Sequence, residues 1–287
     1  MDKPAIATPT QSNYCPQARD TAIEVDRLEF TLLRQKNNSD RALMSAALTR
    51  GARQLSVGGL KRTHSHLSDS SFALLIARAF LGDDKPPNFQ PLGNIMTWIQ
   101  DSLELAVQLR AVFDSLAIPH YITGGVASTT YGEPRTTRDL NIVIFVARSQ
   151  LDVLVSALEQ AGFYVPGVED ARAGSMQSLG ITHLTTIARA DLILAEESEF
   201  DRLKLSRRWE IEIPGRGLLY FASPEDVILN KLRWGQSSQS EKQWRDVLGI
   251  LKVQTTQLDF DYLRSLGEQL ELTDVLSQAF SEAGLAD

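Results

Sequence analysis

Apolar and polar residues alternate along this chain with two different periods, which predict helices in some segments and strands in others. Residues 21–53 carry apolar side chains at helical intervals, with Ser39 as the expected N-cap of a second helix. Residues 82–93 contain three prolines, two glycines and no period, which is typical of a linker. A long amphipathic helix is predicted to follow, capped by Asn94 and running to about Leu116.

Between residues 119 and 222 the pattern changes to short apolar strands around one amphipathic helix. That helix is predicted over residues 151–161, with Gly162 as its C′ residue. After a short strand ahead of Gly124, β segments are predicted at 139–145, 163–165, 182–187, 192–195, 209–213 and 218–222. A further helix is expected to start at Ser223 and Pro224, and the rest of the chain is helical with breaks near 235–240 and 254–258.

These elements predict an α/β (α+β) protein, in which helices flank a mixed sheet. A helical N-terminal region is expected over residues 1–83, with a mobile extreme N-terminus, and a linker over 84–94. The α/β core is expected over 95–222, and a C-terminal helical bundle over 223–287.

Composition places the chain among ordinary globular proteins. It has 287 residues, of which 43% are hydrophobic and 23% charged. Its single cysteine, Cys15, cannot form an internal disulfide, so we expect a cytoplasmic protein. No apolar run is long enough to span a bilayer, so we expect no membrane association. The net charge of −7 argues against nonspecific nucleic-acid binding over the whole surface, although not against a local basic patch.

The candidate chemistry lies in residues 121–145, which read YITGGVASTTYGEPRTTRDLNIVIF. Alternate residues of a strand face the same side, so Asp139 and Asn141 are predicted to point together. Oxygen ligands at that spacing suit Mg²⁺, which favours carboxylates, waters and substrate phosphates. Gly124 and Gly125 allow a sharp turn and a close approach of the backbone to a ligand. A helix that begins just after them would present free N–H groups to a phosphate.

Further donors follow this turn, and each feature also has a plainer interpretation. Ser128, Thr136 and Thr137 add hydroxyl groups and Arg138 adds a cation, all suited to a nucleotide's phosphates. Alternatively, the two glycines form only a tight turn, and an aspartate at a strand entrance serves only as a turn or capping residue. The conjunction of these features in one segment is rarer than any of its parts.

The segment resembles the nucleotidyltransferase fold superfamily, the polymerase-β-like minimal nucleotidyltransferases. Residues 122–125 and 139–142 match the two halves of its pattern, except that Asn141 stands where the family has a second acid. Residues 223–251, SPEDVILNKLRWGQSSQSEKQWRDVLGIL, are similar to the helical part of AbiEii-type toxins and related uncharacterised nucleotidyltransferases. The resemblance implies a nucleotidyltransferase-like sheet, an NTP substrate and, by analogy alone, a toxin–antitoxin role.

The resemblance also implies roles for particular residues. Asp139, Asn141 and Asp191 would hold Mg²⁺ or Mn²⁺, and Asp191 would assist the attacking hydroxyl. Lys231 would neutralise triphosphate charge, and Asp246 would position Lys231 or a base. The alternatives are that Asp191 caps its strand, that Lys231 faces solvent, and that Asp246 lies on a helix surface beside Lys242.

Several functions are possible, depending on whether the site can catalyse a reaction with Asn141 in place of an acid. An amide oxygen can ligate Mg²⁺ but carries no charge, and a two-metal reaction needs shared anionic ligands. The chain is therefore either an enzyme that transfers a nucleoside monophosphate from an NTP to a hydroxyl on RNA or protein, or a degenerate nucleotide-binding or regulatory module. A third possibility is an interaction protein with a vestigial cleft. Glu133, or an acid of the pair at 196–197, is a candidate substitute for the missing carboxylate.

Residues 41–67 contain no acid but several basic residues. The functional interpretation is a contact surface for tRNA, another nucleic acid or an acidic partner, and the alternative is a solvated helix face. The basic residues of this stretch are Arg41, Arg50, Arg53, Lys61 and Arg62. His64 and His66 make only a weak metal motif, because no cysteine or further histidine accompanies them. The sequence does not predict an oligomeric state.

Overall fold

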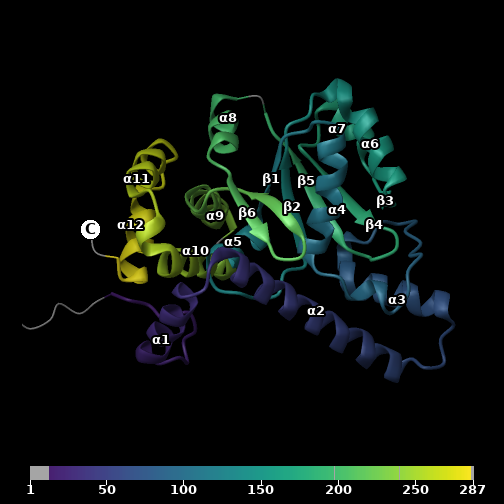
Figure 1. Cartoon of the computed structure of the whole chain (residues 1–287), viewed down its shortest axis with the longest axis horizontal. Helices are drawn as coiled ribbons and strands as arrows, with labels where there is room; N and C mark the ends of the chain where they lie inside the picture. Colours follow the sequence, from purple (N-terminus) through teal and green to yellow (C-terminus); the bar gives the residue numbers. More distant parts are fainter. Residues whose placement is uncertain (1–12, 197, 239, 286–287) are drawn as a thin grey trace, which may run out of the picture.

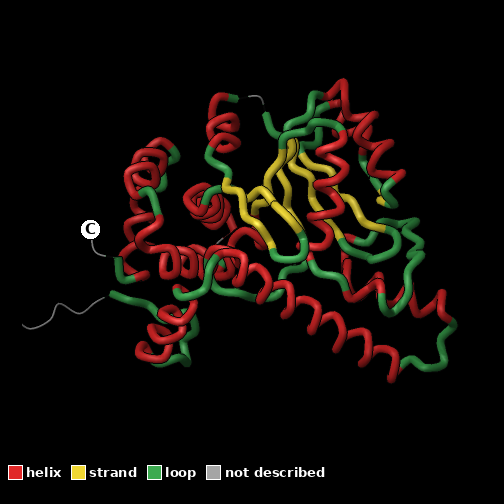
Figure 2. Tube along the Cα trace, viewed as in Figure 1, coloured by secondary structure: helices red, strands yellow, loops and turns green. Residues whose placement is uncertain are grey.

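A computed structural model describes residues 13–196, 198–238 and 240–285 of the chain. Its centre is a sheet with the strand order β3-β4-β5-β2-β1-β7-β6 (Figures 1 and 2). The strands are β1 (His120–Thr123), β2 (Asp139–Ile144), β3 (Phe163–Tyr164), β4 (Ser178–His183), β5 (Arg189–Leu194), β6 (Trp209–Ile213) and β7 (Gly217–Phe221). The sheet is mixed, because β2 pairs with β5 and β1 with β7 in parallel, whereas the other neighbours are antiparallel.

Helices surround the sheet (Figure 1). Those of the N-terminal half are α1 (Ile23–Arg34), α2 (Asn38–Thr63), α3 (Asp69–Leu81), α4 (Ser102–Ser115), α5 (Gly124–Tyr131) and α6 (Leu151–Gln160). Those that follow are α7 (Val168–Ala173), α8 (Glu199–Ser206), α9 (Pro224–Ser238), α10 (Glu241–Gln254), α11 (Phe260–Gln269) and α12 (Thr273–Ala283). The predicted class, a mixed sheet with flanking helices, a helical N-terminal region and a C-terminal helical region, is confirmed.

The alternation of residues along β2 explains why this strand lies at the centre. Leu140, Ile142 and Ile144 are at most 1% exposed and face α4, whereas Asp139 and Asn141 on the other face are half-buried. Full burial of such an aliphatic side chain stabilises the fold by about 1.5–3 kcal/mol. Burial of the apolar face therefore holds the strand in place, and the side chains of the polar face, Asp139 and Asn141, are available to bind a ligand.

The N-terminal helices pack on this core. Ala42 and Ala46 of α2 belong to the same cluster of buried apolar residues as the sheet. Asp26 of α1 forms a buried ion pair with Lys252 of α10, with 2.9 Å between Oδ2 and Nζ. Removal of one partner from a pair of this kind costs about 3–5 kcal/mol, because the other charge is left buried and unpaired. The domain boundaries given above remain predictions.

Three predicted element boundaries are wrong. The N-cap of α2 is Asn37, whose side-chain oxygen accepts a hydrogen bond from the Asp40 N–H, and not Ser39. The long helix begins at Ser102 with Asp101 as its cap, whereas Asn94 precedes a short 3₁₀ turn (Thr97–Ile99). The predicted strand at 182–187 overlaps only the end of β4, and its remaining residues form the turn into β5. Within the described residues, no helix is both long and apolar enough to cross a membrane.

Candidate functional site

The half-buried face of β2 and β5 brings the three predicted metal ligands together. Asn141 lies opposite Asp191 in the parallel register, and Asp139 lies opposite Arg189. These four residues form a two-by-two block on the sheet face. Its two carboxylates, Asp139 and Asp191, lie diagonally across from each other on neighbouring strands. Asp191 therefore lies within its strand, beside Asn141, and not at the strand entrance where the sequence pattern had placed it.

The turn between β1 and α5 contacts this block directly. Gly124 has a φ of 64°, and a Cβ atom added there would lie 2.8 Å from Nδ2 of Asn141. A side chain at this position would be strained and would also collide with Asn141, so only glycine fits. Gly125 lies beside Thr137, whose Cγ2 would be 3.4 Å from an added Cβ. The two glycines therefore bring the backbone at the start of α5 against Asn141 and Thr137, and the predicted approach of this backbone to a phosphate stays a prediction.

The two carboxylates of the block influence each other electrostatically. Burial raises the pKa of Asp139, and the negative charge of Asp191 raises it further, against the opposing charges of Arg138 and Arg189. Such a shift means that the site disfavours a second negative charge. A bound cation would relieve this repulsion.

The donor set suits one hard divalent cation. Two carboxylates, Asp139 and Asp191, and the amide oxygen of Asn141 face the same side, and Mg²⁺ typically binds one or two carboxylates together with substrate phosphates. Within the described part of the chain, no group of three or more His, Cys, Asp or Glu side chains is placed to hold a metal ion. The residues fit a cation that takes its remaining ligands from a nucleotide.

Sequence reasoning missed Arg189 and Asp84. The Nη2 atom of Arg189 lies 2.7 Å from Oδ1 of Asp191, and its Nη1 lies 2.8 Å from Oδ1 of Asp84. Residues two apart in a strand lie on the same face, so the sequence could have predicted that Arg189 lies beside Asp191. The sequence held no signal for Asp84, which lies in the 3₁₀ turn Gly82–Asp84 after α3.

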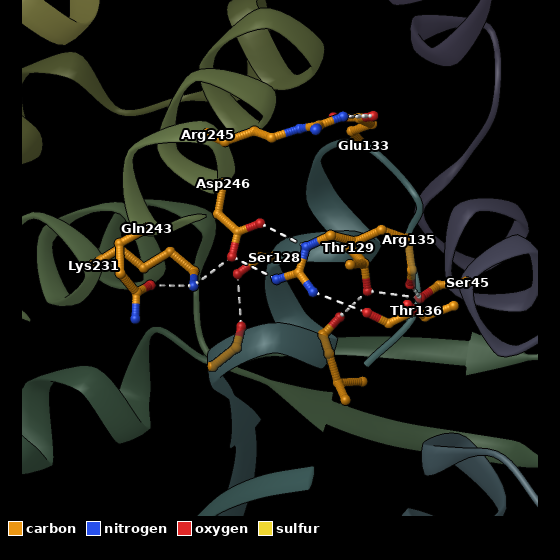
Figure 3. A network of polar contacts seen from close by, with 12 residues as sticks. Ser45, Ser128, Thr129, Glu133, Arg135, Thr136, Lys231, Gln243, Arg245 and Asp246 are labelled. Atoms are coloured by element: carbon orange, nitrogen blue, oxygen red, sulfur yellow. Dashed lines mark hydrogen bonds and ion pairs between the residues drawn. The ribbon is translucent and has the colours of Figure 1, made fainter. Parts of the chain in front are cut away.

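Lys231 and Asp246 meet at the edge of the site in a buried network (Figure 3). Nζ of Lys231 lies 2.7 Å from Oδ2 of Asp246, whose two oxygens also accept hydrogen bonds from Arg135 at 2.7 and 2.9 Å. The side chains of Lys231 and Asp246 are 7% and 6% exposed. The alternatives of a solvent-facing lysine and a helix-surface aspartate are therefore excluded.

The network is held together by its charges. Burial alone would raise the pKa of Asp246, but the hydrogen bond from Arg135 and the charge of Lys231 outweigh it and hold this pKa below its ordinary value. Burial lowers the pKa of Lys231, against the opposing effect of Asp246. Nζ of Lys231 also donates a hydrogen bond to Gln243 at 2.7 Å, so its ammonium group is fixed in position.

Two cavities open on Asp139 and share part of their lining. The smaller cavity, about 660 Å³, is lined by Gly124, Gly125 and Asn141 among other residues. The larger, about 1490 Å³, lies among α2, the segment at 15–19 and α10. Both are lined by Arg135, Thr137, Arg138, Asp139, Lys231 and Lys242. The candidate site is therefore the shared wall of two adjoining spaces.

The predicted phosphate donors are placed differently from one another. Thr137 and Arg138 line both cavities, and Thr136 lines the larger one. Arg138 also donates a hydrogen bond to the carbonyl of Leu81 at 2.9 Å. The hydroxyl of Ser128 donates to the carbonyl of Gly124 at 2.6 Å, and its side chain is buried within α5. Ser128 therefore supports the turn and lines neither cavity.

The basic stretch does not form one open surface, because Arg41 is buried. Arg41 is 3% exposed and donates hydrogen bonds to the carbonyls of Thr130 and Leu33, each at 3.0 Å. Arg50 forms an ion pair with the buried carboxylate of Asp101. The predicted contact surface is wrong for Arg41, whereas for Arg50, with a side chain 38% exposed, and for Arg53 it stays a prediction. Lys61 pairs with an exposed aspartate of α3, and Arg62 stays untested.

The candidate substitutes for the missing acid also fall in different places. Glu133 pairs with Arg245 at 2.6 Å (Figure 3). Glu196 lines the smaller cavity, whereas Glu197 lies outside the described residues. Glu133 is therefore engaged by Arg245, whereas Glu196 shares a cavity with Asp139 and stays a candidate.

No protein-family model matches the sequence, and neither does any curated protein. Several solved structures are similar in part, among them the following three. An antigenic nucleotidyltransferase-like protein from Paracoccidioides brasiliensis is 18% identical, with 63% of this chain and 92% of that chain covered and a TM-score of 0.43. ANT(2'')-Ia in complex with adenylyl-2''-tobramycin is 17% identical, with 59% and 96% covered and a TM-score of 0.42.

The third is a solution structure of the antibiotic-resistance factor ANT(2'')-Ia. It is 16% identical, with 62% of this chain and 92% of that chain covered and a TM-score of 0.39. At these TM-scores, none of the three similarities identifies the activity of the chain.

Proposed function

We propose that this protein transfers a nucleoside monophosphate from an NTP to a hydroxyl group on RNA or protein, with one Mg²⁺ or Mn²⁺ ion bound by Asp139, Asp191 and Asn141. The observation that carries the proposal is the placement of two carboxylates, Asp139 and Asp191, on one half-buried sheet face, where Asp139 lines both cavities. The resemblance of residues 122–142 to minimal nucleotidyltransferases supports the same reaction.

In the proposed reaction, the acceptor hydroxyl oxygen forms a bond to the α-phosphorus and pyrophosphate leaves. The divalent cation, when bound, supplies charge neutralisation for the phosphates. The N–H groups at the start of α5 and the side chains of Thr137 and Arg138 would bind phosphate oxygens. Lys231, held by Asp246, would contribute a fixed positive charge at the triphosphate. Asp191 would orient the attacking hydroxyl and accept its proton. Positioning and electrostatics would supply most of the rate acceleration.

The lining of the larger cavity favours RNA among the two acceptors. Arg53, Arg138 and Lys242 face this space, and none of them makes an ion pair with a carboxylate in the described part of the chain. The guanidinium of Arg53 stacks on Phe80, and burial lowers its pKa to about 10. Arg53 is half-buried, whereas Arg138 and Lys242 are exposed, and together they make this side of the cavity positively charged. A phosphodiester backbone would supply the matching negative charge.

The second candidate is a nucleotide-binding or regulatory module without turnover. The neutral Asn141 favours it, together with the engagement of Asp191 by Arg189. In this case the NTP would bind between Gly124 and Lys231, but no label would reach an acceptor. For the active enzyme we also propose a cytoplasmic location. A toxin-like role is proposed only by analogy with AbiEii-type proteins.

The test is transfer of label from each α-³²P NTP, with Mg²⁺ or Mn²⁺, to total cellular RNA and protein. The expected result is labelled RNA that is sensitive to ribonuclease and resistant to protease. Transfer by Asn141→Asp alone would favour the binding module, because the site would then be intact but disarmed. Absence of both transfer and nucleotide binding in all variants would refute both candidates.

A further inference from the structure

The floor of the smaller cavity changes in character along its length. It includes Asp139 and Asn141 on the polar face of β2, and Val143 follows on the same face of that strand. In the strand register, Val143 lies between Tyr121 of β1 and Ile193 of β5, and both of these residues also line the cavity. Four strand residues span about 13 Å. A ligand that fills the cavity therefore meets oxygen ligands at one end and aliphatic and aromatic carbon at the other.

The cations of the cavity favour phosphates at the polar end. Those that line both cavities lie, together with Asp139, at the wall that the cavities share. Asp246 neutralises one of their charges through its contacts with two of them, so a net positive charge remains at this wall. A nucleotide whose phosphates bind here must place its nucleoside in one of the two cavities. The shared cations are Arg135, Arg138, Lys231 and Lys242.

The volumes of the cavities favour the smaller one for the nucleoside. Binding sites for small ligands and cofactors measure about 300–1,000 Å³. The smaller cavity, about 660 Å³, lies in this range, whereas the larger, about 1490 Å³, exceeds it. The apolar floor at Val143 and Ile193 belongs to the smaller cavity alone. A nucleoside bound there would leave the larger cavity to the acceptor.

Helix α8 contributes a further wall to the smaller cavity. Phe200, Asp201 and Lys204 line this cavity and not the larger one. The carboxylate of Asp201 accepts a hydrogen bond from the hydroxyl of Ser198, the N-cap of α8, at 2.9 Å. Lys204 is half-buried, and its Nζ lies 3.8 Å from the centre of the Phe200 ring. The helix therefore presents a lysine ammonium group to the inside of the cavity.

This ammonium group has no polar partner at short range. Within the described ranges, Nζ of Lys204 makes no hydrogen bond and no ion pair. Burial lowers the pKa of Lys204 against the opposing charges of Asp226 and Asp201, and the charge of Arg233 lowers it further. The oxygens of Asp226 accept hydrogen bonds from Tyr262 and from the serine that precedes α9. The N–H donors of Lys204 are therefore available to a ligand in the cavity.

We propose that the NTP lies along the floor of the smaller cavity, with its nucleoside over Tyr121, Val143 and Ile193 and its base accepting a hydrogen bond from Nζ of Lys204. Lys204 is then a nucleoside-binding residue that contacts no phosphate. The inference rests on the proposed function for the identity of the ligand, but its test measures binding and does not depend on transfer.

The test compares two ligands of the full-length chain by isothermal titration calorimetry with Mg²⁺. The first is an α,β-methylene NTP analogue, which cannot be cleaved between the α- and β-phosphorus, with the base that the wild type binds most tightly. The second is inorganic tripolyphosphate, which fills only the polar end. The wild type should bind the analogue at least about tenfold more tightly, because burial of the nucleoside on the apolar floor is favourable.

Lys204→Met should weaken binding of the analogue by about tenfold and leave binding of tripolyphosphate unchanged, since a hydrogen bond from a charged donor contributes about this factor. No residue of α8 is buried, so the variant should keep its fold. The matched control is Lys61→Met. Nζ of Lys61 also lies over an aromatic ring, 4.8 Å from the centre of Phe72, but lines neither of the two cavities. It should bind both ligands as the wild type does, whereas Lys242→Met, at the shared wall, should weaken both.

Two outcomes would overturn the proposal directly. One is an analogue that binds the wild type no more tightly than tripolyphosphate. The other is an equal loss of both ligands in Lys204→Met, which would make Lys204 a phosphate ligand. If this variant does not fold, Val143→Phe tests the cavity from its floor. It should weaken the analogue and not tripolyphosphate, and unchanged binding of the analogue would contradict the proposal.

Failure of this inference and failure of the proposed function give different results. The expected binding pattern without label transfer to any acceptor would refute only the proposed function. Label transfer by the wild type, together with unchanged affinity of Lys204→Met for the analogue, would refute only this inference.

Discussion

Replacement of Asp246 by asparagine removes the carboxylate that pairs with both Lys231 and Arg135. Asp246→Asn keeps the size of the side chain but leaves Lys231 and Arg135 without a negative partner. Their side chains are 7% and 21% exposed, so water can compensate little of the lost interaction. Removal of one partner from a buried ion pair costs about 3–5 kcal/mol, because the other charge stays desolvated. That is a large share of a total stability of about 5–15 kcal/mol.

The structure also predicts an unequal effect of the two partners. Lys231→Met should cost less than Asp246→Asn, because Asp246 would keep both of its hydrogen bonds from Arg135. A matched control is Glu133→Gln, which breaks the neighbouring pair with Arg245. Arg245 is 46% exposed, so this change should cost no more than about 1 kcal/mol.

The assay is urea unfolding of the four proteins, followed by tryptophan fluorescence. Trp244 lies two residues from Asp246 and reports on α10. With a slope of about 3 kcal/mol per molar urea, a loss of about 3 kcal/mol would lower the midpoint by about 1 M. A loss for Asp246→Asn as small as that for Glu133→Gln would refute the reasoning from burial.

Two further predictions concern the turn and the cap of α4. Gly124→Ala should cost more than Gly215→Ala by urea unfolding: both have a positive φ, which costs about 1–2 kcal/mol in alanine, but only the former places a Cβ against Asn141. Equal losses would contradict the contact. Burial alone would raise the pKa of Asp101, but hydrogen bonds from Arg216 and other donors hold it below its ordinary value. The ionised Asp101 therefore stabilises the fold near neutral pH, and this contribution is lost as the pH falls below about 5. The stability of Asp101→Asn should fall less than that of the wild type over this range. An equal fall in both proteins would contradict the lowered pKa of Asp101.

The parts of the site that depend on local periodicity were predictable from the sequence. The spacing of Asp139 and Asn141 places both on one strand face, and two glycines between strand and helix indicate the turn. The position of Asp191 beside Asn141 depends on strand register, which a distant strand sets. The sequence pattern therefore found the residue but placed it at the wrong point of its strand.

Several of the missed features depend on contacts between distant segments. Asn94 and Asp101 both precede the same apolar stripe, and the choice of cap is made by Arg216 and Arg50, which pair with Asp101 from other elements. The basic stretch looked continuous along the sequence, yet Arg41 is buried against the carbonyl of Thr130. Propensity and composition carry no information about such partners.

The most direct test of the central claim compares label transfer from α-³²P and γ-³²P NTP to RNA, in the wild type and in Asp139→Ala. The wild type should transfer only the α label and release the γ label as pyrophosphate, and Asp139→Ala should do neither. Transfer of the γ label would show a different reaction. Transfer of the α label that survives in Asp139→Ala would show that this sheet face is not the active site.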